Sequence, residues 1–142
     1  MKTIHFFLLS SFIGILCGCS NDSGNGGAVE AVTDILKSGT WRVTYFFKSS
    51  QDKTASYTGY VFTFYSVGTL TAVHDSIDEL GVWSPIERDD NDNCDLVISF
   101  ITQNVVSELS NNWHVIDFSD LLIRMADEAG TTGPEYLTIE KN

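Results

Sequence analysis

The stretch from Trp41 to Phe47 reads WRVTYFF, and it shows the pattern on which the prediction of the fold depends. Its large apolar side chains recur at every second position, at Trp41, Val43, Tyr45 and Phe47. A period of two is typical of a β-strand, because successive side chains point to opposite faces. We therefore expect a strand that places these four side chains on one buried face.

Seven further segments have a similar composition. Valine, isoleucine, threonine and aromatic residues are concentrated in each, and glycine, asparagine, aspartate and serine separate them. The spacing is close enough for antiparallel hairpins. The segments are Tyr57–Tyr65, Thr69–His74, Gly81–Ile86, Asp95–Ile101, Trp113–Phe118, Leu121–Ala126 and Glu135–Lys141.

Two other segments have helical spacing. Residues 28–37 (AVEAVTDILK) place Val29, Val32 and Leu36 on one side of a short amphipathic helix, and residues 103–110 form a second short segment of this kind. No long helix is predicted between strands, which excludes parallel βαβ units. The sequence predicts an all-β fold: a single eight-stranded antiparallel up-and-down barrel with a short N-terminal helix. A β-sandwich is the alternative.

The first 18 residues have the features of a lipoprotein signal peptide. One basic residue, Lys2, precedes an apolar run over residues 4–16, which is shorter than the roughly 20 residues that a spanning helix needs. The run ends in LCGC at residues 16–19 and resembles a bacterial lipobox. That resemblance implies cleavage before Cys19 and lipidation of its thiol; an ordinary cleaved signal peptide is the alternative. Because Ser20 rather than aspartate follows, we expect an outer-membrane anchor, on the periplasmic face or the cell surface.

The rest of the chain divides into a tether and one domain. Residues 19–27 are rich in glycine, serine and asparagine and predict a flexible tether, and residues 28–142 suffice for one domain with its own core. The formal net charge of −11 argues against a nucleic-acid or anionic-membrane surface. We therefore predict that the protein contacts the membrane through its lipid anchor only, and that it does not bind nucleic acid.

One cysteine, Cys94, remains in the predicted domain once Cys17 is removed and Cys19 is lipidated. A single cysteine can form neither an intramolecular disulfide nor a thiolate zinc site. The sequence places Cys94 in a polar loop without an evident basic neighbour, so no motif supports a reactive thiol.

A family resemblance appears at Gly39-Thr40-Trp41, which opens the first strand after a short helix as the Gly-x-Trp motif does in lipocalins. With the later segments, the chain from Leu36 to Asn142 resembles the lipocalin-like lipoproteins common in Bacteroidetes, most of which have no assigned activity. The resemblance implies a late basic residue packed over the indole, and Arg124 is the nearest candidate by position. The later segments are Phe62-Thr63-Phe64, Gly68-Thr69-Leu70, Gly81-Val82-Trp83-Ser84, Leu96-Val97-Ile98, Trp113-His114-Val115 and residues 136–141.

The candidate ligand site is the predicted barrel interior. An eight-stranded barrel is just wide enough to be filled by side chains or to hold one small ligand, and the lipocalin resemblance favours a small hydrophobic ligand. The alternative is a structural or interaction module with a packed barrel that acts through its surface on a protein or glycan partner. The predicted interior residues are Trp41, Tyr45, Phe62, Phe64, Ile98, Trp113 and Val115.

Some aromatic side chains cannot share that interior. Phe46 and Phe47 are adjacent and must face opposite sides of a strand, and Tyr57 and Tyr65 oppose the face of Phe62. They are expected either to lie under the two helical segments or to form an exposed patch for a partner.

No motif for catalysis or cofactor binding is present. The chain has no Gly-x-Ser-x-Gly motif, and the predicted domain holds two histidines, His74 and His114, whose spacing indicates no pairing. The acidic stretch at residues 89–95 has oxygen ligands for calcium, but it lacks the glycine and glutamate of an EF-hand loop. We therefore predict a solvated hairpin connection there, with a calcium site of another type as the alternative. We also predict a protein that is not an enzyme and has no cofactor.

Overall fold

The computed structural model describes residues 27–88, 93–130 and 132–142. The predicted signal peptide and the tether up to residue 26, Cys19 included, lie outside the described residues. Residues 89–92, which make up most of the acidic stretch with oxygen ligands suited to calcium, also lie outside the described residues.

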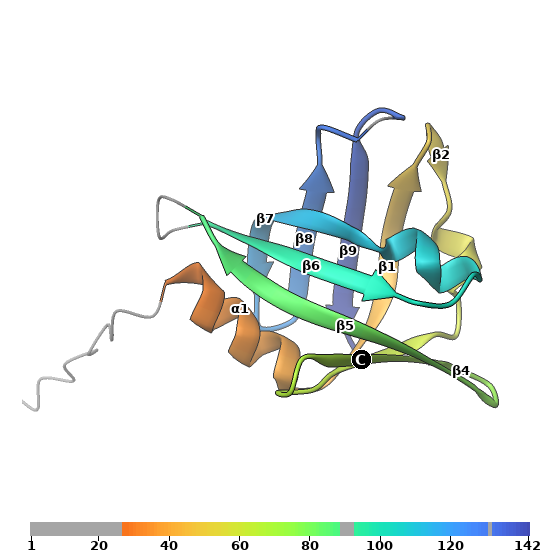
Figure 1. Cartoon of the computed structure of the whole chain (residues 1–142), viewed down its shortest axis with the longest axis horizontal. Helices are drawn as coiled ribbons and strands as arrows, with labels where there is room; N and C mark the ends of the chain where they lie inside the picture. The colour runs from red at the N-terminus through yellow and green to blue at the C-terminus, as the bar shows by residue number, and fades with distance from the viewer. Residues whose placement is uncertain (1–26, 89–92, 131) are drawn as a thin grey trace, which may run out of the picture.

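The fold is a closed barrel of eight antiparallel strands (Figure 1). One further short strand lies outside the barrel and pairs with the end of β1. Each strand pairs with its neighbour along the chain, and β1 pairs with β9 to close the barrel. The predicted up-and-down barrel is therefore confirmed over the sandwich. The barrel strands are β1 (Thr40–Lys48), β3 (Val61–Phe64), β4 (Thr69–His74), β5 (Ile77–Glu87), β6 (Cys94–Phe100), β7 (Asn111–Ser119), β8 (Leu122–Asp127) and β9 (Glu135–Lys141).

The second half of β1 does not pair with β3. Its neighbours on that side are a short strand and a 3₁₀ helix that follow β1 in the chain. β1 pairs with β3 only at Thr40 and Trp41, and its end pairs with the short strand β2 (Gln51–Asp52). A 3₁₀ helix, η1 (Thr54–Tyr57), lies beside β1, and the backbone amide of Phe46 donates to Thr54 Oγ1 at 2.9 Å. Tyr57, predicted to begin a strand, ends this helix instead.

A β-bulge in β1 corrects the prediction for Tyr45. The register with β9 shifts between Val43 and Tyr45, so one extra residue interrupts the alternation. Beyond the bulge the faces exchange: Phe46 is fully buried, whereas Tyr45, predicted to point inward, is 40% exposed. Alternation alone assigns these two aromatic residues to the wrong sides.

Short helices lie at the two ends of the barrel. The predicted N-terminal helix is α1 (Ala28–Lys37), and its Val32 and Leu36 side chains are fully buried. The second predicted helical segment contains a 3₁₀ helix, η2 (Val105–Leu109), in the connection from β6 to β7. In the part of the chain that the structure describes, no helix is both long and apolar enough to cross a bilayer.

Candidate functional site

The barrel interior is a single buried cluster of side chains. Tyr45 lies outside it, but the structure brings the other predicted interior residues together there, each at most 4% exposed. They are Trp41, Phe62, Phe64, Ile98, Trp113 and Val115.

At one end, Trp41 is held between α1 and the last strand. Its Nε1 donates to the backbone oxygen of Leu36 at 3.0 Å. Lys141, opposite Trp41 in the β1–β9 register, places its Nζ 5.7 Å from the indole centroid and donates to Ser38 Oγ at 2.7 Å. The basic residue over the indole is therefore Lys141, in a cation–π contact.

Arg124, the residue predicted for that position, lies elsewhere. It is opposite Thr138 in the β8–β9 register, on the outer face of the barrel, and its Nη1 lies 3.5 Å from Asp117 Oδ2. The prediction is wrong because position along the chain does not reveal which face of its strand a residue occupies; the closing register does.

At the other end, Trp113 is held by η2. Its Nε1 donates to the backbone oxygen of Leu109 at 2.9 Å, and the Tyr57 hydroxyl donates to the backbone oxygen of Val105 at 2.8 Å. The Phe46 ring packs edge-on against both aromatic rings, with centroids 5.3 Å from Tyr57 and 6.3 Å from Trp113. Burial, reinforced by the negative charge of Glu108, raises the pKa of Tyr57 well above its ordinary value, so its hydroxyl stays a donor.

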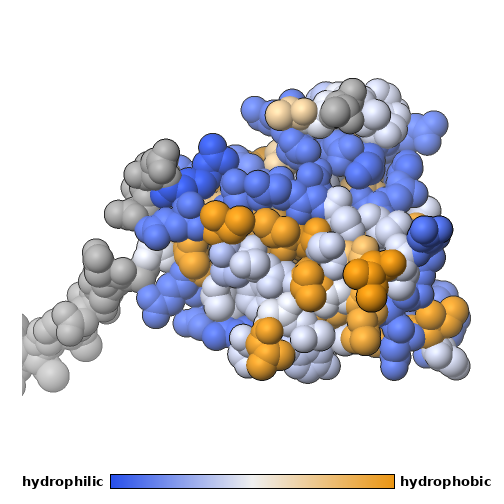
Figure 2. Space-filling model, viewed as in Figure 1, coloured by the Kyte–Doolittle hydropathy of each residue, from blue (hydrophilic) through white to orange (hydrophobic). Residues whose placement is uncertain are grey.

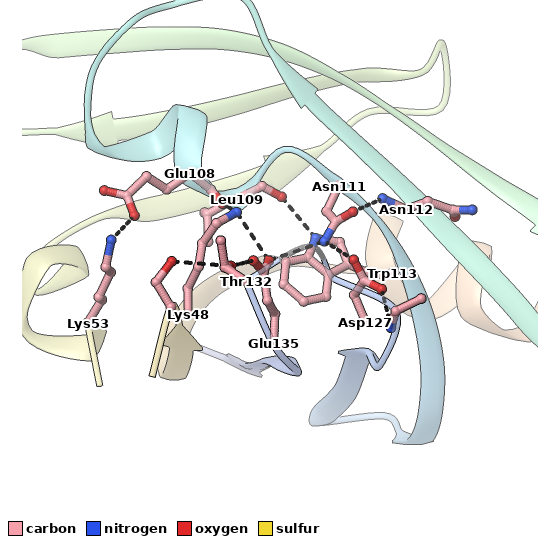
Figure 3. A network of polar contacts seen from close by, with 12 residues as sticks. Lys48, Lys53, Glu108, Leu109, Asn111, Asn112, Trp113, Asp127, Thr132 and Glu135 are labelled. Carbon is pink, nitrogen blue, oxygen red and sulfur yellow. Dashed lines mark hydrogen bonds and ion pairs between the residues drawn. The ribbon is translucent and has the colours of Figure 1, made fainter. Parts of the chain in front are cut away.

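A polar network lies beside this second end (Figure 3). The buried carboxylate of Glu135 lies 3.1 Å from Lys48 Nζ, which also donates to the backbone oxygen of Glu108 at 3.0 Å. Asn111 Nδ2 donates to Asp127 Oδ2 at 2.9 Å and to Glu135 Oε2 at 3.3 Å. The buried carboxylate of Glu135 is therefore well partnered, and the network joins β1, η2, β7, β8 and β9.

A polar groove of about 330 Å³ on the outside includes one of the two histidines. His114 Nδ1 lies 3.2 Å from Asp95 Oδ1, and Arg88 Nη1 donates to the same oxygen at 3.0 Å. A histidine–aspartate pair can orient a general base, but the described residues that line this groove include no serine, threonine or cysteine nucleophile. His74 has a different environment, stacked on Tyr60 with centroids 4.7 Å apart.

Cys94 is not in a loop, as the sequence predicted, but begins β6 with its side chain fully buried. Burial, and secondarily the negative charge of Asp95, raises the pKa of its thiol to about 11. The thiolate is the reactive form, so this thiol is protected at neutral pH.

The outward side chains of β4, β5 and β6 form a surface that sequence reasoning did not single out. Leu80 and Val82 are 56% and 57% exposed, and they flank Gly81 in a groove of about 240 Å³. We call the whole surface the uncharged face. At one end of β5 it is bounded by Asp78, and at the other end by Asp95 of β6, which pairs with Ile86. It consists of Thr69, Thr71, Leu80, Val82, Ser84, Ile86, Val97, Ser99 and Ile101.

The uncharged face is visible in Figure 2, where apolar side chains gather over the strands nearest the viewer and hydrophilic ones surround them. The exposed patch is thus mainly aliphatic. Of the aromatic residues that the sequence left open, Phe46 and Tyr57 are buried beside the 3₁₀ helices, whereas Tyr65 is exposed. The sequence did hold an indication of this face, because β5 has large apolar residues on both of its sides. Trp83 points inward, whereas Leu80, Val82 and Ile86 point outward.

Comparison with known proteins adds support for the fold. Neither protein-family models nor curated proteins match this sequence. Among solved structures, the chain is similar to a DUF4847 family protein from Bacteroides vulgatus, with a TM-score of 0.53 and 19% sequence identity, covering 78% of this chain and 97% of that one. At this level of identity the similarity concerns the barrel fold alone.

Proposed function

We propose that this chain is a lipid-anchored envelope protein whose barrel is a rigid interaction module that acts through its outer surface. The observation that carries this proposal is the burial of large aromatic side chains inside the barrel. Trp41 and Trp113 are fully buried, and each is hydrogen-bonded to the short helix at its own end of the barrel.

The competing proposal is a hydrophobic ligand held inside the barrel. Ligand pockets have volumes of about 300 Å³ or more and are lined by the residues that hold the ligand. The grooves of about 240 and 330 Å³ are lined instead by outward residues. Aromatic side chains occupy the interior of this narrow barrel, which favours the surface over the inside.

The lipobox-like sequence at residues 16–19 supports the anchor. A tether of residues 19–27 would keep α1 within about 30 Å of the membrane, at roughly 3.5 Å per extended residue. The barrel would then present its surface to neighbours in or on the same membrane.

Native mass spectrometry of the gently purified full chain tests the filled interior. We expect the mass of the protein with its acyl chains and no further small molecule, and no rise in melting temperature with added palmitate. A Trp113→Ala variant is the control, since a cavity of indole size should let added indole raise its melting temperature. A co-purified apolar molecule in the unmodified protein would overturn the proposal.

The anchor has its own test. Cys19→Ala should abolish incorporation of labelled palmitate into the chain, because it removes the acylated thiol. Cys17→Ala is the matched control and should still be labelled. Unchanged labelling of the Cys19 variant would exclude this residue as the anchor.

A further inference from the structure

We infer that the polar groove at His114, together with the aromatic side chains beside it, is a binding site for a neutral saccharide. This inference rests on the proposed function and names the class of ligand that the outer surface binds. It follows from the order of side chains across four strands, from the polar groups in the groove and from the charge of the groove.

One row of outward side chains crosses four strands of the barrel. His114 of β7 pairs with Ala126 of β8, and Ala126 pairs with Tyr136 of β9. Tyr136 in turn pairs with Phe47 of β1, and the centroids of these two rings lie 6.3 Å apart. Partners in an antiparallel ladder point to the same face of the sheet. The polar groove, which includes His114 and Ala126, therefore continues into two aromatic rings.

The β-bulge in β1 adds aromatic side chains to this row. Beyond the bulge Phe46 points inward, so Tyr45 and Phe47 point outward, on the same side as Tyr136. We call Tyr45, Phe47 and Tyr136 the aromatic strip. Among the residues that the structure describes, none of the three belongs to the buried core or packs against it. The core therefore does not account for their aromatic character, and bulges are frequent where a side chain is re-aimed beside a site.

The polar groove presents groups that suit hydroxyls. Asp95 contacts His114 at Nδ1, which orients the ring and leaves Nε2 for a ligand. In the described part of the chain, His114 Nε2, the side-chain oxygen of Asn112 and the carboxylate of Glu128 make no hydrogen bond or ion pair. A hydroxyl both donates and accepts, so a ligand dense in hydroxyls is able to pair with all three groups.

The charge of the groove disfavours other ligands. Asp95, Asp127 and Glu128 outnumber Arg88 along it, and the chain has a formal net charge of −11, so anions are repelled. Asp95 and Asp127 already accept hydrogen bonds from the protein, which leaves little for a cationic amine. The described residues also contain no group of three acidic, histidine or cysteine side chains suited to a metal ion.

The size of the site fits a short saccharide chain. The groove volume of about 330 Å³ lies at the lower end of the range for small-molecule sites, about 300–1,000 Å³. With strands about 4.8 Å apart, the row from β7 to β1 is roughly 14 Å long. A sugar in the groove would pair through its hydroxyls, and the next sugars would place their apolar faces on the aromatic strip.

Affinity gel electrophoresis of the full chain tests the inference. The lipoprotein, in a non-ionic detergent without a sugar headgroup, is run in native gels that contain dextran, galactomannan, arabinoxylan or amylopectin. Polygalacturonate is the anionic control. We expect at least one of the neutral polysaccharides to retard the protein, and polygalacturonate to leave its migration unchanged.

Paired variants locate the site. Tyr136→Ala should weaken the association by about tenfold, because it removes the central ring of the aromatic strip, whereas Tyr136→Phe should keep it. Tyr65→Ala is the matched control, since Tyr65 is exposed but lies outside the strip. His114→Ala should also weaken binding and His74→Ala should not, although the two side chains are 40% and 37% exposed. Urea unfolding shows whether each variant keeps its fold.

The other outcomes are distinct. No retardation by any of the four neutral polysaccharides, or equal weakening by Tyr136→Ala and Tyr65→Ala, would overturn the inference. Retardation by polygalacturonate would also overturn it, as would a salt-sensitive rise in melting temperature with spermine in the absence of retardation, because the ligand would then be charged. None of these results concerns the barrel interior. A ligand inside the barrel would instead contradict the proposed function, so the two failures are distinguishable.

Discussion

At both ends of the barrel a buried tryptophan is hydrogen-bonded to a short helix, but the chemical surroundings of the two tryptophans differ. At each end a fully buried indole donates to a backbone oxygen of a short helix, Leu36 of α1 or Leu109 of η2. Around Trp41 the neighbours are apolar, with one lysine over the ring. Around Trp113 they include the ion pair between the partly buried Lys48 and the buried Glu135.

This difference separates two ways of stabilising one fold. The α1 end depends mainly on apolar burial, which does not require an ionised side chain. The η2 end depends partly on the buried carboxylate of Glu135, which is tolerated only while its cationic partner remains. Removing a group from each end should therefore have effects of different size and kind.

The largest effect is expected at the apolar end. Trp41→Ala should lower the free energy of unfolding by about 3–5 kcal/mol, since it leaves a cavity and removes the contact with α1. Urea unfolding followed by circular dichroism measures this loss. Trp41→Phe should cost less, because much of the buried area remains. A loss below about 1.5 kcal/mol for the alanine variant would mean that α1 closes that end without the indole.

The next effect concerns the ion pair of Lys48 and Glu135. Lys48→Met should cost about 2 kcal/mol, because Glu135, with only 6% of its side chain exposed, would lose its cationic partner. Adding Glu135→Gln should restore part of that loss. The matched control is Arg42→Met in the exposed pair with Glu140 across the same two strands, which should cost at most about 1 kcal/mol. Equal losses in the two variants, measured by urea unfolding, would show that burial adds nothing to the Lys48 pair.

Alkaline pH gives a smaller effect. In the folded chain the pKa of Cys94 is raised from 9.0 to about 11. Between those values the unfolded chain loses the proton and the folded chain keeps it, so the free energy of unfolding falls as pH rises from 9 to 11. We expect a loss of up to about 2 kcal/mol, smaller in Cys94→Ala. Tyr57 adds to the fall above pH 10 in both proteins. Identical pH profiles by urea unfolding would show that Cys94 does not contribute.

The sequence predicted the strands well, because alternation and turn residues are local signals. The predicted bounds of β4 (Thr69–His74) and β9 (Glu135–Lys141) agree with the structure residue for residue. The eight-strand barrel followed from the number of segments and the absence of long helices. Six of the seven predicted interior residues, all except Tyr45, are buried as the period of two indicated.

The errors arose where a residue's environment depends on distant pairing. The bulge in β1 leaves no local signal, so Tyr45 and Phe46 were assigned to the wrong faces. Lys141 reaches Trp41 only because β9 closes on β1, which chain position could not reveal. Whether the aromatic side chains leave room for a ligand also depends on side-chain packing rather than on residue type.

The position of α1 has a mechanical consequence. The chain enters the barrel through this helix, so a pull on the residues before Ala28 loads α1 before it loads any strand. The load would fall first on the packing of Val32 and Leu36 and on the hydrogen bond from Trp41 to Leu36. The β1–β9 seam would be stressed only after that contact gave way. The helix that fills one end of the barrel would thus also absorb force, since it lies between the strands and whatever holds the N-terminus.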